Sequence, residues 1–195
     1  MLKKKYNELI NNYSNWVILI VLLQSIGRKI VNIFSTAYWR LAGVKMGEGT
    51  IIQYGVKINC AKKVNLGNNC LITKGTIITS EVYDKGLLLL EDNVQINSKV
   101  HLDITGELTI KRETLISEGT FIYTHDHGYN PKSKPIASSL TIGEKVWIGA
   151  NCTILSSVAN IESNSIVGTN TLVSKNISQN SLVVGIPGKV IKTLN

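Results

Sequence analysis

The chain has 195 residues, the size of one domain with a small appendage, and it is long enough to bury a core. Its formal net charge is +8, yet residues 1–45 hold seven of its 21 basic residues against one of its 13 acidic residues. A nucleic-acid-binding protein more often carries a basic stripe on its folded surface. The charge distribution therefore argues against nucleic acid as a partner.

The cysteines and the N-terminal sequence bear on the compartment. The chain has an odd number of cysteines, Cys60, Cys70 and Cys152, and their spacing is not that of a zinc site. They lie beside apolar positions, so we expect them to be reduced thiols in or near the core. Polar residues separate the lysines at 3–5 from the first apolar run, and no small-residue cleavage site follows, so a secretory signal peptide is not expected. These features favour a cytoplasmic protein.

Residues 1–45 are predicted to form one or two helices. The eight consecutive apolar residues Trp16–Leu23 are too few to cross a bilayer, and apolar residues recur around them in steps of three and four. Ser14 or Asn15 could begin a second helix as its N-cap. Two placements stay open. The segment could pack on the end of the following domain or on a neighbouring subunit, or residues 1–40 could lie on an anionic membrane surface.

Residues 46–175 carry a six-residue repeat, which neither a helical nor a simple strand period produces. Each hexad is expected to form a short strand and a turn, and three hexads to close one triangular coil, with the first aliphatic side chain of each hexad pointing inward. The sequence therefore predicts an all-β fold, a three-sided parallel β-helix of about six coils, with a short C-terminal tail over residues 176–195. The six triplets of inward residues are Met46, Ile52, Ile58; Leu66, Ile72, Ile78; Leu90, Ile96, Leu102; Ile110, Ile116, Ile122; Ile142, Ile148, Ile154; and Ile161, Val167, Val173.

The steps between triplets locate the loops. The long step from Ile78 to Leu90 is interpreted as one further hexad, in which Asp84 stands where the inward aliphatic residue would be. The step from Ile122 to Ile142 is 20 residues, far more than the repeat requires. It predicts an external loop over residues 123–141, and long loops on rigid scaffolds often carry function.

Two further sequences stand out beside the ladder. The long loop contains Tyr123-Thr-His-Asp-His-Gly-Tyr-Asn-Pro131, and Val184-Gly-Ile-Pro-Gly-Lys189 lies near the C-terminus. Together with the ladder they resemble the hexapeptide-repeat acyltransferases, above all the galactoside, maltose and surface-polysaccharide O-acetyltransferases, over roughly residues 44–191. The resemblance implies a left-handed β-helix, acetyl-CoA as the acyl donor, no metal, a carbohydrate acceptor, and a homotrimer with active sites between subunits.

The resemblance also implies a catalytic residue. In that family a histidine on the protruding loop removes the proton from the acceptor hydroxyl as this attacks the thioester, a role that suits an imidazole near neutral pH. Alignment of the two loop ends assigns this role to His127. His125 then holds a position that the family does not require, where we expect a contact with the acceptor. Asp126 could orient either imidazole, although adjacent residues usually point apart.

Binding residues outside the loop follow from the same resemblance. Asn97 aligns with an asparagine that binds the acceptor sugar. His101, beside the inward Leu102, is expected to face outward in either a structural or an acceptor-groove role. At Lys189 the family usually has an arginine-type residue, so a bidentate phosphate contact is lost. The residues expected at the cofactor are Ala150 and Thr169, through their amides, at the pantetheine end, and Ser174, Lys175 and Lys189 at the nucleotide and phosphates.

The leading hypothesis is an acetyl-CoA-dependent O-acetyltransferase of surface polysaccharide or lipopolysaccharide synthesis, at the inner face of a bacterial cytoplasmic membrane. An N-acetyltransferase on an amino-sugar nucleotide and an antibiotic acetyltransferase are the alternatives. A γ-type carbonic anhydrase on the same fold needs three convergent histidines, and the spacing of the three histidines in this chain does not match that pattern. The histidine loop argues against a non-catalytic scaffold.

Overall fold

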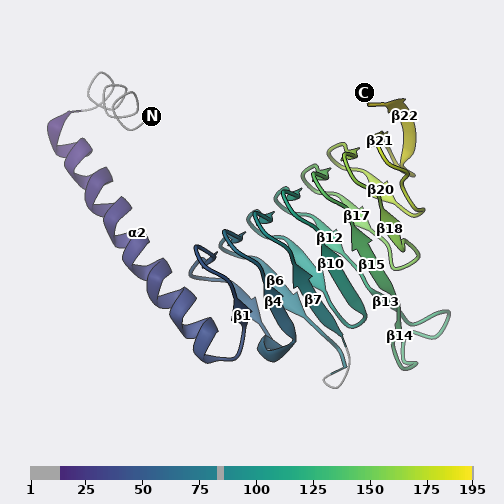
Figure 1. Ribbon diagram of the computed structural model, residues 1–195, viewed down its shortest axis with the longest axis horizontal. Helices are drawn as coiled ribbons and strands as arrows, with labels where there is room; N and C mark the ends of the chain where they lie inside the picture. Colours follow the sequence, from purple (N-terminus) through teal and green to yellow (C-terminus); the bar gives the residue numbers. More distant parts are fainter. Residues whose placement is uncertain (1–13, 83–85, 195) are drawn as a thin grey trace.

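The computed structural model of the protein describes residues 14–82 and 86–194. One long helix, α2 (Asn15–Leu41), precedes a column of stacked turns, each built from short strands of three parallel sheets (Figure 1). Sheet A contains β1 (Lys45–Met46), β4 (Val64–Leu66), β7 (Leu87–Leu90), β10 (Glu107–Ile110), β15 (Ser139–Ile142) and β18 (Asn160–Ile161). Sheet B contains β2 (Ile51–Ile52), β5 (Leu71–Ile72), β8 (Gln95–Ile96), β11 (Leu115–Ile116), β16 (Trp147–Ile148), β19 (Ile166–Val167), β21 (Ser181–Val184) and β22 (Lys189–Thr193). Sheet C contains β3 (Lys57–Ile58), β6 (Ile77–Thr79), β9 (His101–Asp103), β12 (Phe121–Ile122), β17 (Thr153–Ile154) and β20 (Leu172–Val173).

The strand registers confirm the predicted ladder. In sheet B, for example, Ile72 pairs with Ile52 on one side and with Ile96 on the other. The same alignment runs through all three sheets, and every ladder residue except Met46 and Ile58 of the first turn is buried. Burial of each such side chain contributes roughly 1.5–3 kcal/mol. The stacked aliphatic columns therefore hold the turns together. Hydrogen bonds between the strands of successive turns pair the backbone N–H and C=O groups.

The column has about seven turns, one more than expected. Ile177 bridges to Ile161, and Val183 pairs with Val167, so the columns of sheets A and B continue past Val173. The next position in this series is Lys189, which broke the aliphatic pattern. Strand β22 then pairs antiparallel with β21. Residues 177–184 of the segment expected as a tail thus belong to the β-helix.

Extra residues are inserted at one corner of the triangle, where the chain passes from sheet C to sheet A. The loop over residues 123–141 leaves there, as predicted. The segment between Ile78 and Leu90 is also a corner loop rather than a further hexad, because β7 follows β6 directly in the next sheet and pairs with β4 and β10. The position expected to lack an inward aliphatic residue, Asp84, lies outside the described residues. The two longest insertions thus share one corner.

Helix α2 begins after Ser14, one of the two predicted N-caps. Only its C-terminal part meets the β-helix: the Thr36 hydroxyl bonds the backbone of Ile52, Asn32 accepts the N–H of Tyr54, and Trp39 packs on the core. The rest projects away from the first turn (Figure 1). It therefore does not pack across the end of the column, which was one of the two placements expected for this segment. The helical positions expected before Ser14 lie outside the described residues.

The helix is also longer and more apolar than the run of eight residues suggested. By length and composition, Trp16–Leu41 could cross a membrane, although a core helix or a signal sequence can meet the same criterion. Its surroundings are unlike those of a core helix, because only 6% of its apolar window is buried. The run Trp16–Leu23, too short to span a bilayer by itself, is thus part of a helix that has sufficient length and apolar composition.

Candidate active site

The external loop is shaped by a small antiparallel hairpin, β13 (His125–Asp126) with β14 (Ile136–Ala137). Side chains two residues apart in an extended segment share a face, and the His125 and His127 rings accordingly lie 5.2 Å apart between centroids, edge to face. Asp126 turns away from them. Its carboxylate accepts the N–H of Gly128 and lies 3.2 Å from the Ser156 hydroxyl.

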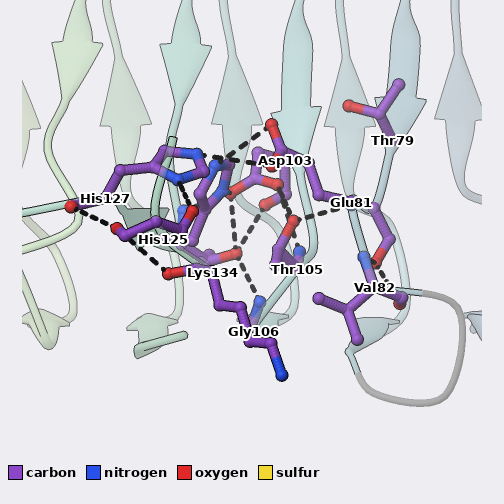
Figure 2. A network of polar contacts seen from close by, with 12 residues as sticks. Thr79, Glu81, Val82, Asp103, Thr105, Gly106, His125, His127 and Lys134 are labelled. Carbon is purple, nitrogen blue, oxygen red and sulfur yellow. Dashed lines mark hydrogen bonds and ion pairs between the residues drawn. The ribbon is translucent and has the colours of Figure 1, made fainter. Parts of the chain in front are cut away.

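Three successive turns bring their C-to-A corners together beneath this loop. Thr79 pairs with Asp103, and Leu102 pairs with Ile122, so the segments that follow β6, β9 and β12 are stacked. The corner after β6 supplies Glu81, the last residue of β9 is Asp103, and the loop after β12 supplies both histidines. Figure 2 shows these side chains joined in one polar network.

Asp103 is the buried anchor of this network, with 4% of its side chain exposed. It accepts hydrogen bonds from Thr105, from the Thr124 N–H at 2.7 Å and from His125 Nδ1 at 2.8 Å. Burial alone would raise the pKa of Asp103, but these hydrogen bonds outweigh it and hold the pKa below its ordinary value of 3.8. The carboxylate is therefore ionised, and His125 carries its proton on Nδ1.

His127 is oriented by the backbone of its own loop. Its Nδ1 lies 2.8 Å from the carbonyl oxygen of Ser133, which can only accept, so Nδ1 carries the hydrogen. The Ser133 hydroxyl in turn donates to the His127 carbonyl at 2.6 Å. In the neutral ring Nε2 is therefore the unprotonated nitrogen. His127 is 27% exposed against 11% for His125, so His127 is the more accessible of the two bases.

Glu81 faces the Nε2 atoms of both histidines. Its two carboxylate oxygens lie 3.4 Å from His125 Nε2 and 3.4 Å from His127 Nε2. Its backbone N–H donates to the hydroxyl of Thr105, which donates to Asp103. The ligand atoms of Glu81, His125 and His127 all lie within 4.8 Å of one another, an arrangement that could hold a metal ion.

Glu81 and Asp103 were missed by the sequence interpretation, which considered Asp126 as the partner of the histidines. Alignment of the ladder would have exposed both, because Thr79, Asp103 and Tyr123 each follow an inward residue of sheet C in successive turns. Glu81, Asp103 and the two histidines then fall at the same corner of the triangle. The pairing of Asp103 with His125 rather than His127 depends on side-chain geometry and has no sequence signal.

The other predicted acceptor residues lie elsewhere. Asn97 follows β8 at the B-to-C corner, where its side chain accepts a hydrogen bond from Gln95. His101 lies on the outer face of sheet C, with Nε2 2.9 Å from the Thr79 hydroxyl and its ring edge-on to Phe121. Burial lowers the pKa of His101 below 6.5, although Asp103 opposes this. These contacts favour the structural interpretation of His101.

The predicted cofactor residues occupy three places on one chain. Ala150 and Thr169 hold equivalent positions at the B-to-C corner of adjacent turns, since each follows a paired ladder residue, Ile148 or Val167, by two residues. Ser174 and Lys175 follow β20 at the C-to-A corner. Lys189 begins β22, at the edge of sheet B. Within one chain these residues therefore lie at two different corners and at the edge of sheet B.

A cleft of about 430 Å³ opens beside the base of the loop. Thr105, a member of the network, is part of its wall. Gly106 and Ser138, which flank the start and end of the loop in space, are two others. The cleft therefore adjoins the network and is lined largely by small and polar residues.

Comparison with known proteins gives a consistent assignment. No family model matches the chain. It is 32% identical over 158 residues to the Escherichia coli protein named "Putative lipopolysaccharide biosynthesis O-acetyl transferase WbbJ", covering 74% of this chain and 79% of the relative. It is 27% identical over 154 residues to the E. coli protein named "Putative colanic acid biosynthesis acetyltransferase WcaF", covering 78% of this chain and 71% of the relative.

Solved structures agree on the fold. AntD, an N-acyltransferase from Bacillus cereus solved with dTDP and coenzyme A, is 21% identical, with a TM-score of 0.69 over 82% of this chain and 89% of that protein. The acetyltransferase domain of PglB from Neisseria gonorrhoeae, solved with acetyl coenzyme A, is 15% identical, with a TM-score of 0.57 over 73% of this chain and 58% of that protein. At these identities the likeness concerns the fold alone.

Proposed function

Because this chain belongs to the hexapeptide-repeat acyltransferases, we propose that it transfers an acetyl group from acetyl-CoA to a sugar hydroxyl during synthesis of a bacterial surface polysaccharide or lipopolysaccharide. Family membership makes the protein an acyltransferase. The names of the two relatives, lipopolysaccharide biosynthesis for one and colanic acid biosynthesis for the other, support the acceptor class. Acetyl-CoA as donor is supported by the coenzyme A complexes of two proteins of the same fold.

The observation that carries the proposal is the tautomer of His127. With its hydrogen on Nδ1 held by the Ser133 carbonyl, Nε2 offers a lone pair at the accessible side of the ring. In the proposed reaction Nε2 takes the proton of the acceptor hydroxyl as the oxygen attacks the thioester carbonyl carbon. The tetrahedral intermediate then expels the CoA sulfur, which takes the proton back from the imidazolium.

The remaining members of the network have supporting roles in this scheme. Glu81 lies next to Nε2 of His127 and stabilises the imidazolium that forms during the reaction. His125 is fixed by Asp103, so its Nε2 can accept a hydrogen bond from a second hydroxyl of the acceptor. A sugar carries several adjacent hydroxyls and suits such a paired site.

The spread of the cofactor residues supports a homotrimer with the site between subunits. On a single chain the amides at Ala150 and Thr169 lie at a different corner from the histidine loop. In a trimer one subunit would supply the loop and its neighbour the pantetheine groove, with Ser174, Lys175 and Lys189 at the nucleotide and phosphates. The acceptor contact proposed for Asn97 also requires such a neighbour, since Asn97 lies at the corner of Ala150.

The proposed location is the inner face of the cytoplasmic membrane, with the N-terminal segment in contact with lipid. Large apolar side chains are exposed along α2, including Trp16 at 77%, Ile33 at 67% and Phe34 at 71%. Large exposed apolar patches rimmed by polar residues commonly mark sites of protein or membrane contact. Arg28, Lys29 and Arg40 would meet anionic headgroups.

The experiment that tests the reaction class is incubation of purified protein with radiolabelled acetyl-CoA and isolated surface-polysaccharide precursors. Acceptor-dependent release of free CoA thiol should accompany label that mild alkali removes from the glycan, as expected for an ester. Alkali-stable label would instead indicate an amide and the alternative N-acetyltransferase. If acetyl-CoA is not lost to hydrolysis and still no carbohydrate is labelled, the proposed acceptor class is contradicted.

A further inference from the structure

We propose that Glu81, His125 and His127 form a binding site for one divalent transition-metal ion, with zinc the best match. The first argument is the direction of the lone pairs. Asp103 fixes the hydrogen of His125 on Nδ1, and the Ser133 carbonyl fixes that of His127 on Nδ1. Both unprotonated Nε2 atoms therefore face the same carboxylate, and one electron-pair donor from each residue lies within 4.8 Å of the other two.

The distances between the imidazoles and the Glu81 carboxylate also favour a metal site. Hydrogen bonds between an imidazolium and a carboxylate are about 2.7–2.9 Å long, whereas both Nε2 atoms lie 3.4 Å from a carboxylate oxygen of Glu81. Zinc bonds of about 2.0–2.1 Å in a tetrahedron give edges of about 3.3–3.4 Å between ligand atoms. Each Nε2 lies at that separation from its own carboxylate oxygen, Oε1 for His125 and Oε2 for His127, and one ligand atom from each of the three residues lies within 4.8 Å of the other two. A set of two imidazoles and one carboxylate suits zinc, whereas magnesium and calcium prefer oxygen ligands.

The third argument is the support behind the ligands. Histidine ligands of metals commonly donate their second ring N–H to a carboxylate or a backbone carbonyl, which fixes the tautomer and the ring orientation. His125 does the first and His127 the second. The ligand Glu81 is anchored through its N–H to Thr105, and the adjacent Ser80 is held by Asn59 through two hydrogen bonds. All three ligands are thus positioned within one chain.

This proposal departs from the expectation of no metal that the family resemblance implied, and it differs from the carbonic anhydrase alternative, which was judged on histidines alone. Glu81 is 44 residues before His125 in the sequence, and only the stacking of corners brings it to the site. His101 is not a ligand, because its Nε2 faces Thr79. The site is therefore distinct in composition from three convergent histidines.

Occupancy by zinc has a consequence for the reaction, and this part rests on the proposed function. The ion would use the Nε2 lone pair with which His127 takes the proton of the acceptor. Zinc and base catalysis would then exclude each other. We expect zinc to inhibit acetyl transfer in competition with the acceptor, and chelation to restore the full rate.

The binding test uses full-length protein freed of metal with a chelator and titrated with zinc chloride by calorimetry. Cobalt chloride is the spectroscopic probe, because a tetrahedral N/O site gives intense visible absorption. One ion per chain is expected. Glu81→Gln, which keeps the shape of the side chain, and His125→Ala should each lower zinc affinity at least as much as the roughly 10–100-fold typical of a lost supporting residue. His101→Ala is the matched control and should bind zinc like the wild type.

Three outcomes would overturn the inference. The wild type could fail to bind either ion, or Glu81→Gln and His125→Ala could both retain wild-type affinity, which would place the ion elsewhere. Loss of transfer on chelation with recovery on zinc addition would contradict the inhibitory role. If no acceptor is acetylated but the zinc titration gives the expected pattern, the proposed function fails while the metal site stands.

Discussion

At the scale of single residues, Asp103 shows how one buried carboxylate fixes the geometry of the site. One oxygen accepts from the backbone and hydroxyl of Thr105, and the other accepts from Thr124 and His125. The same carboxylate thus ties together its own corner, the start of the external loop and the ring of one histidine. An amide in its place would turn one acceptor into a donor that faces other donors.

We predict that Asp103→Asn lowers the free energy of unfolding by about 1–3 kcal/mol, because buried donors are left unpaired. Because the pKa of Asp103 is depressed in the folded state, its stabilising contribution is complete above the unfolded pKa and is lost as the pH falls through the folded pKa. The difference in unfolding free energy between wild type and variant, measured in urea, should shrink as the pH falls through the folded pKa of Asp103.

Asp92→Asn is the matched control for this measurement. The pKa of Asp92 is also lowered by hydrogen bonds, from Asn68, but its side chain is exposed and water can replace the lost contacts. Asp92→Asn should therefore lower the free energy of unfolding by less than Asp103→Asn does. An equal effect of both substitutions, or a gap that widens in acid, would contradict the assigned role of Asp103.

At the scale of elements, the external loop depends on a close approach at its base. A Cβ atom on Gly106 would collide with the carbonyl oxygen of Ser138 and lie 2.7 Å from that of Thr124. These two residues belong to the start and the end of the loop. Gly106 also donates its N–H to the Thr124 hydroxyl, so no side chain can be added without moving the loop.

Gly106→Ala is therefore expected to destabilise the protein by about 1–3 kcal/mol, as overpacking does, and to lower acetyl transfer by displacing the histidines. Gly27→Ala is the control. Nothing lies within 4 Å of a Cβ at Gly27 in α2, and the change should be neutral or raise helix stability by up to about 1 kcal/mol. Thermal unfolding and transfer rates of both variants measure this, and wild-type behaviour of Gly106→Ala would contradict it.

The elements also show what a sequence can predict. The eighteen predicted ladder positions were correct, because six-residue spacing of aliphatic residues has one structural explanation here, whereas Ile177 and Val183 of the last turn were missed. The corner after Ile78 was misinterpreted, since its length happens to equal two regular steps. Contacts among Glu81, Asp103 and the histidines depend on which turns stack, and side-chain direction within a corner has no period in the sequence.

At the scale of the whole molecule, the exposed α2 helix stands apart from the β-helix (Figure 1). We predict that the wild type co-sediments with vesicles of phosphatidylglycerol and phosphatidylcholine. Ile20→Glu with Leu23→Glu, two positions that are 52% and 59% exposed, should abolish most of this binding, because burial of charge in the hydrocarbon costs several kcal/mol. High salt should weaken wild-type binding only in part.

Gln24→Glu is the control for charge alone, because it replaces an exposed polar side chain on the same stretch of helix. It should bind vesicles nearly as well as the wild type. Wild-type protein that stays in the supernatant would contradict membrane contact. A double variant that instead changes the oligomeric state would assign α2 to an interface between subunits.

His127 is the proposed base of the acetyl transfer. The most direct test is the turnover rate of His127→Ala on the acceptor identified by ester formation, with acetyl-CoA binding measured alongside. We predict that the rate falls by about 10²–10⁴-fold, the usual contribution of a general base, while acetyl-CoA binds as it does to the wild type. An unchanged rate in His127→Ala would contradict the claim.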